Sequence, residues 1–133
     1  MKLAALALLI GTGAASAEQD ALIALSDVQY QRHEVLFEPA GAYEAVRRVV
    51  RLRLVANEIA DQSNFGFDVI ERDIQSLCDT EGLRIVSKFA PNATEIVISV
   101  AAEKTVFGEP APSIVQYFDV FSVVDGTCVW GGL

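Results

Sequence analysis

The clearest alternation of apolar and polar side chains lies in Glu44–Asn57. The apolar positions are Val46, Val50, Leu52 and Leu54, and the opposite positions are Arg47, Arg51 and Arg53, interrupted by Val49. Successive side chains of a strand point to opposite faces, whereas a helix would distribute these arginines around its circumference. The segment is therefore predicted to be a half-buried antiparallel strand, with a row of arginines on the face away from the core.

A helical pattern follows in the middle of the chain. Apolar residues recur there at spacings of three and four, at Phe67, Ile70, Ile74, Leu77 and Cys78. Asp68 is predicted to be the N-cap, with Glu71 as its capping-box partner three residues later. Gly82 is predicted to end the helix in the left-handed conformation. Cys78 then lies on or beside the buried stripe of this helix.

Several other segments are rich in β-branched and aromatic residues and predict strands. They are Asp27–Phe37, Leu83–Phe89, Glu95–Ala101, a brief edge pairing at Val106-Phe107, and two strands within Gln116–Trp130. Asp125-Gly126 separates the last two, and Asp-Gly between such residues predicts a two-residue hairpin turn. Ile114–Val124 fits both a helix and a strand, and the turn that follows favours a strand.

The first 17 residues have the pattern of an export signal. Met1-Lys2 gives a positive start, Leu3–Ile10 is apolar but too short to span a bilayer, and Ala15-Ser16-Ala17 resembles a cleavage site. Residues 1–17 are therefore predicted to be a signal peptide cleaved near Ala17, and residues 18–133 a single domain. The mature protein is expected in the periplasm or secreted, without an integral membrane segment.

Export affects the interpretation of the two cysteines, Cys78 and Cys128. In an oxidising compartment a pair of cysteines in a small domain is most simply one disulfide. The alternative is two free reactive thiols, which a Cys-x-x-Cys spacing or a neighbouring base would favour, and neither is present. Together, these features predict an α+β domain. It consists of an antiparallel β-sheet of five to six strands with one main α-helix packed on one face, and a disulfide ties this helix to the C-terminal hairpin.

The composition argues against one class of partner, and the motifs point to no particular chemistry. With 10 Lys and Arg against 18 Asp and Glu, the net charge is −8, which disfavours binding to nucleic acid. The single histidine, His33, does not provide a zinc site of the usual kind. The Asp61–Gly66 segment resembles a calcium loop only superficially, since Phe65 occupies a ligand position and Arg72 replaces the closing glutamate. No catalytic residue, metal site or cofactor is therefore predicted.

Two features are candidates for a binding surface. The arginine row of Arg47, Arg51 and Arg53 could hold an anionic group, although pairing with carboxylates such as Glu34 or Glu95 is the simpler interpretation. Trp130 is either a core residue or an exposed surface anchor. Its alternation with Cys128 on one strand face favours the core.

The pattern as a whole resembles a family of small secreted proteins of Alphaproteobacteria that is known only as a domain of unknown function. The matching segments are Val35–Phe37, Arg51–Ile59, Asp73–Cys78, Ile96–Val100 with Val106–Gly108, and the Y-F-D-V-F and D-G-T-C-V-W runs of Gln116–Trp130. Its most specific part is the signature of L-C followed by D-G-T-C-x-W. The resemblance implies export and a Cys78–Cys128 pair, and it implies no activity, ligand or catalytic residue.

Two hypotheses for function follow. The first is a soluble periplasmic or secreted non-catalytic binding or interaction protein, whose partner is a protein or a small anionic ligand in the cell envelope. The second is a small periplasmic hydrolase whose carboxylates come together only in the fold. A deep pocket with clustered, perturbed acids would favour the hydrolase, and an exposed face with apolar and arginine side chains would favour binding.

Overall fold

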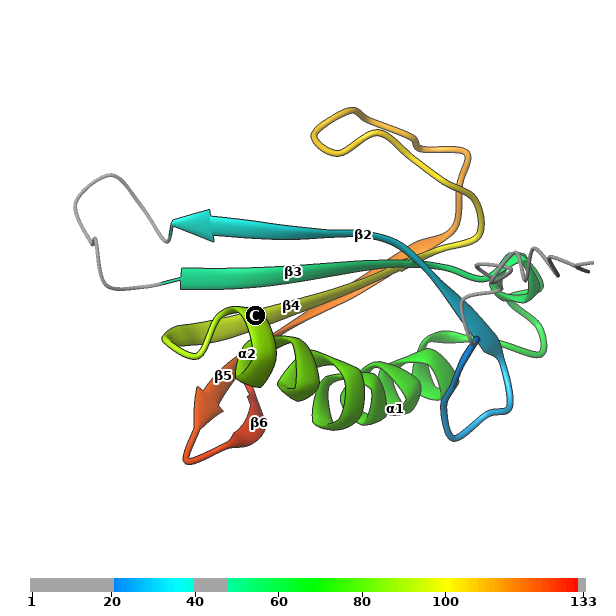
Figure 1. Ribbon diagram of the computed structural model, residues 1–133. Helices are drawn as coiled ribbons and strands as arrows, with labels where there is room; N and C mark the ends of the chain where they lie inside the picture. The colour runs from blue at the N-terminus through cyan, green and yellow to red at the C-terminus, as the bar shows by residue number, and fades with distance from the viewer. Residues whose placement is uncertain (1–20, 40–47, 132–133) are drawn as a thin grey trace, which may run out of the picture.

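The computed structural model describes residues 21–39 and 48–131, in which a six-stranded sheet carries helices on one face (Figure 1). The strands are β1 (Leu22–Ile23), β2 (Gln29–Pro39), β3 (Arg48–Val55), β4 (Ala93–Ala101), β5 (Gln116–Val124) and β6 (Thr127–Trp130). The helical segments are η1 (Asn57–Ala60), α1 (Phe67–Leu77), the π-helical turn η2 (Cys78–Gly82) and α2 (Leu83–Phe89). The predicted signal peptide, Val46 and Arg47 lie outside the described residues.

The strands follow one another across the sheet in the order β1-β2-β3-β4-β5-β6. All neighbours are antiparallel except β3 and β4, which are parallel, with Leu52 opposite Ile98. The prediction of a purely antiparallel sheet was therefore wrong, and the sheet is mixed. The helices between β3 and β4 carry the chain back along the sheet, so that β4 starts at the same end as β3.

Helix α1 buries the predicted stripe against the sheet. Ile70, Ile74, Leu77 and Cys78 are buried, which confirms this part of the stripe. Phe67 is an exception, because it lies at the exposed start of the helix, with its ring centroid 6.2 Å from that of Tyr117. The N-cap is Gly66, so the prediction of Asp68 was wrong. Asp68 is instead in the first turn, where its charge favours the helix dipole.

Gly82 does not end the helical region. Its φ of −59° is right-handed, and the chain passes through η2 directly into α2. The predicted strand at Leu83–Phe89 was therefore wrong. A Cβ on Gly82 would lie 3.3 Å from Cγ2 of Ile96, so the glycine allows the helix to approach β4 closely. The role of Gly82 is therefore close packing against β4, and it does not form a left-handed cap at the end of the helix.

The C-terminal predictions are confirmed more closely. The ambiguous segment Ile114–Val124 contains strand β5, and the turn has φ values of 50° at Asp125 and 71° at Gly126. Both angles are positive, as the type I′ hairpin turn requires. The expected edge pairing at Val106-Phe107 was wrong, because these residues lie in a loop between β4 and β5 that has no regular strand in it.

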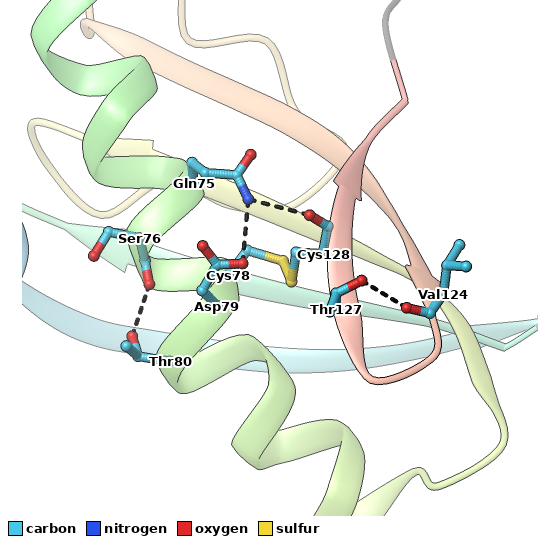
Figure 2. Close-up of a disulfide and its surroundings, with 8 residues drawn as sticks. All are labelled: Gln75, Ser76, Cys78, Asp79, Thr80, Val124, Thr127 and Cys128. Atoms are coloured by element: carbon cyan, nitrogen blue, oxygen red, sulfur yellow. Dashed lines mark hydrogen bonds between the residues drawn. A yellow bond between two sulfur atoms is a disulfide. The ribbon is translucent and has the colours of Figure 1, made fainter.

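A single core fills the space between the sheet and the helices. It contains Val50, Leu52 and Leu54 of β3 and Ile96, Ile98 and Val100 of β4, which confirms the predicted inner face of β3. The Cys78–Cys128 disulfide is also confirmed, with Cα atoms 6.2 Å apart (Figure 2). Beside it, Nε2 of Gln75 donates a hydrogen bond of 3.2 Å to the carbonyl oxygen of Cys128. The helix and the hairpin are thus joined at two adjacent points.

Candidate binding face

The face of the sheet away from the helices carries Arg51 and Arg53 of β3, the two members of the predicted arginine row that the structure describes. Alternation places Arg51 and Arg53 on this face, beside Ser99 of β4, which in turn pairs with Phe118 of β5. The long loop of residues 102–115 rises on the same side, opposite α1 (Figure 1). We call this surface, with its loop, the open face.

Arg53 fastens the loop to the sheet. Its side chain is only 8% exposed and makes an ion pair with Glu34 on β2. Its Nη2 donates hydrogen bonds to the carbonyl oxygen of Thr105 at 3.0 Å and to its Oγ1 at 2.7 Å. The guanidinium is therefore committed to internal partners on both sides. Glu34 is one of the carboxylate partners that the sequence suggested for the arginine row, and the ion pair of Arg53 with Glu34 agrees with that interpretation.

Arg51 is held more loosely, and its side chain is 24% exposed. Its Nε and Nη2 lie 3.3 and 3.4 Å from the carboxylate oxygens of Glu38, which are long separations for a charged pair. Its Cζ lies 4.9 Å from the centre of the Phe107 ring, and that of Arg53 lies 5.5 Å from it. Both guanidinium groups are thus within the range of a cation–π interaction with one ring.

A shallow cleft of about 180 Å³ lies between the loop and the sheet. Its lining includes Arg51, Arg53, Phe107 and Phe118. Phe118 is 56% exposed and Phe107 47% exposed, and the adjacent Val106 is also exposed. Aromatic residues and arginine are enriched at protein interfaces and among the residues that dominate binding energy. The cleft therefore combines an apolar surface with one accessible positive charge.

Sequence patterns identified only half of this cleft. The arginines were predicted from the alternation in β3, but the two phenylalanines were missed. Phe118 could have been found once β5 was assigned as a strand, because alternation places it opposite to Tyr117 and Asp119. Phe107 lies in an irregular loop, where no periodic signal indicates the direction of a side chain.

Trp130 is 55% exposed, so the prediction that it is a core residue was wrong. It does share a face with Cys128, which is buried, but it is the last residue of the edge strand β6. Its neighbour across the hairpin, Phe121, is 1% exposed and takes the place under the helix. The indole Nε1 donates a hydrogen bond of 3.2 Å to Oδ1 of Asp119.

Two buried carboxylates have internal partners. Glu81 receives hydrogen bonds from Nε of Arg32 at 2.7 Å and from Nε and Nη2 of Arg84 at 2.9 and 2.7 Å. Burial alone would raise the pKa of the Glu81 carboxyl, but the hydrogen bonds and charges of Arg84 and Arg32 prevail and lower it to about 2. A general acid needs a raised pKa instead, so Glu81 has the properties of an ion-pair partner.

Among the described residues, Asp73 is the other buried carboxylate, and it accepts hydrogen bonds from Ser26 and Tyr30. His33 lies at a bulge in β2, between Arg32 and Glu34. Within residues 21–39 and 48–131, no three His, Cys, Asp or Glu side chains gather as metal ligands would. Over the same ranges, none of the helices has the length and apolar character needed to cross a membrane.

Comparisons with known proteins give one result. A sequence model described as "Family of unknown function (DUF6497)" matches residues 7–133, which is nearly the whole chain. Neither the curated proteins nor the solved structures contain a match.

Proposed function

We propose that this chain, which belongs to the family of unknown function, is a non-catalytic binding protein that uses the open face. The family has no assigned activity, so the proposal is argued from the residues of this chain. We place it in the periplasm or outside the cell, after cleavage near Ala17. The observation that carries the proposal is the cleft in which exposed Phe107 and Phe118 lie beside the accessible Arg51.

The composition of the cleft indicates the kind of partner. Exposed aromatic rings favour an apolar side chain, since their burial removes apolar surface from water. The guanidinium of Arg51 lies at the same cleft and favours a carboxylate, which would compete with the long contacts to Glu38. We therefore propose a protein segment that presents an apolar residue next to an acidic one. In this interpretation Arg53 supports the loop and does not contact the partner.

The test is affinity capture from periplasmic extract, with quantitative mass spectrometry of what is retained. The immobilised proteins are the mature chain and two variants, Phe118→Ser and Phe89→Ser. Phe89 is a matched control, because it is 60% exposed and lies on α2, across the sheet from the cleft. Proteins retained by the mature chain should be lost with Phe118→Ser and kept with Phe89→Ser.

The charge is tested in the same way with Arg51→Gln, for which Lys88→Gln, at an exposed position of α2 on the helical side, is the control. Thermal unfolding of every variant should first establish that it is folded. Retention of the same proteins by Phe118→Ser and Arg51→Gln would show that the open face is not the binding surface. Fractionation, with sequencing of the mature N-terminus, tests the proposed export.

A further inference from the structure

A second cleft lies on the helical side of the sheet, at the edge where Trp130 emerges. It has a volume of about 280 Å³. It is lined by Glu71, Arg72, Gln75, Asp119, Phe121 and Trp130. We call it the Trp130 cleft. It is separate from the open face, because its strand residues Asp119, Phe121 and Trp130 point to the opposite side of the sheet from Phe118.

Hydrogen bonds hold one side chain on each wall of the Trp130 cleft. On the strand side, the indole is oriented by its hydrogen bond to Asp119. On the helix side, Gln75 reaches from α1 to the carbonyl oxygen of Cys128, and the disulfide follows one turn later (Figure 2). Trp130 and Gln75 therefore have less conformational freedom to lose when a ligand binds, which favours binding.

The chemistry of this cleft suits a cation. The face of an exposed indole attracts positive charge, and tryptophan does so more strongly than the other aromatic residues. Two carboxylates line the same cleft, with Glu71 on the helix and Asp119 on the strand. Only Arg72 opposes them, in a chain whose net charge is −8. An anionic ligand would meet both carboxylates, so charge complementarity favours a positive group.

We propose that the Trp130 cleft binds a lysine side chain of a partner polypeptide. The volume is slightly below that of usual small-molecule pockets, which suits one side chain. The alkyl stem would lie along the indole and over Phe121, while the ammonium reaches the carboxylates. The three donors of an ammonium diverge and can serve carboxylates on two walls. The planar guanidinium of arginine instead matches a single carboxylate in a bidentate arrangement.

The cleft contains its own reporter, since Trp130 is the single tryptophan of the chain. The mature protein is titrated with Nα-acetyl-lysine N-methylamide while the indole fluorescence is recorded. The corresponding norleucine derivative is the neutral control, and the arginine derivative and putrescine are titrated in parallel. The lysine derivative should give a saturable change that weakens at high salt. The norleucine derivative should give no such change.

Three substitutions, each of which removes one charge, test the electrostatic origin of binding at this cleft. Asp119→Asn and Glu71→Gln should each weaken binding of the lysine derivative by about two- to fivefold. The amide introduced by Asp119→Asn would still present an oxygen to the indole N–H, so the ring should keep its place. Arg72→Gln should tighten binding, because it removes the opposing charge. Glu103→Gln, in the exposed loop of the open face, should change nothing.

Several outcomes would overturn the proposal. An equal response to the norleucine derivative would indicate a purely apolar cleft. Tighter binding of the arginine derivative, or binding of putrescine as strong as that of the lysine derivative, would exclude a lysine side chain as the preferred ligand. Unchanged affinity in Glu71→Gln and Arg72→Gln would remove its electrostatic basis. These two positions are on the helix surface, so the test does not depend on Asp119→Asn folding normally.

Discussion

The phenolic hydroxyl of Tyr30 donates a hydrogen bond of 2.7 Å to Oδ2 of Asp73, and both side chains are completely buried. The two residues are 43 positions apart and join β2 to α1. The backbone N–H and the hydroxyl of Ser26 also donate to this carboxylate. A buried charge is tolerated when its acceptor sites are occupied, and here three donors occupy them. This contact attaches the N-terminal part of the domain to the helix.

Tyr30→Phe removes one of these donors without changing the volume of the core. We expect it to lower the free energy of unfolding by about 1.5–3 kcal/mol, because the lost hydrogen bond is to a charged group. Tyr117→Phe is the control, since the Tyr117 hydroxyl contacts only the exposed Gln62 among the described residues, at 3.3 Å. Urea unfolding measures both variants. Equal losses in the two would mean that the Tyr30–Asp73 contact contributes nothing specific.

The low pKa of Glu81 predicts a loss of stability in acid. Its pKa is about 2 in the folded protein, below the ordinary value of 4.5, because Arg84 and Arg32 stabilise the charged form against the cost of burial. The folded state therefore binds fewer protons than the unfolded state between these values. The resulting stability is complete above pH 4.5 and is lost as the pH falls towards 2.

Glu81→Gln should make this contribution visible. At pH 7 it should cost about 1–3 kcal/mol, because Arg84 is half exposed and solvent screens its share. The difference from the parent protein should shrink as the pH falls from 4.5 to 2. Denaturant unfolding across this range measures it, with Glu103→Gln as the control. A difference that stays constant with pH would contradict the ion-pair account.

The disulfide predicts a dependence on redox state. It closes a loop with a sequence separation of 50, which corresponds to about 4 kcal/mol on the chain-entropy account and commonly to less. Unreduced protein should show no thiol that can be alkylated, as judged by mass spectrometry. Reduction should lower the free energy of unfolding by about 2–4 kcal/mol. Two alkylated cysteines in unreduced protein would disprove the bridge.

Sequence patterns correctly predicted the elements in which the apolar residues follow a single regular spacing. In β3 and α1 the buried residues follow spacings of two and of three to four, and the Asp125-Gly126 turn has its own local signature. The direction in which β4 pairs with β3 was missed, because pairing depends on the path of the chain between the strands. The alternation in Leu83–Phe89 was misleading, because a helix that continues from Gly82 buries Ile85 and Val86 equally well.

The candidate site was predictable only where strand periodicity directs side chains. Arg51 and Arg53 could be assigned to one face, but their different roles could not. The role of Arg53 depends on Thr105, which is 52 residues away, and that of Arg51 on Phe107 in the same loop. No local pattern in the sequence indicates such contacts, because the loop has no period and its path depends on the rest of the fold.

These different roles lead to a prediction that separates the two arginines. Arg53→Gln leaves Glu34 without its partner and frees Thr105, and we expect it to cost about 2–3 kcal/mol. It should also increase amide hydrogen exchange in the loop of residues 102–115. Arg51→Gln loses long contacts to Glu38 and a cation–π interaction, and it should cost about 0.5–1 kcal/mol without altering exchange in the loop.

The distinction decides how binding at the open face must be measured. A double substitution of Arg51 and Arg53 would confuse loss of contact with loss of the loop, because Arg53 holds the loop that carries Phe107. The single Arg51→Gln variant keeps the loop in place, so a loss of partner capture can be attributed to the missing guanidinium. If Arg51→Gln disturbs loop exchange as much as Arg53→Gln, the proposed division of roles is wrong. Arg51 would then also be a residue that supports the loop.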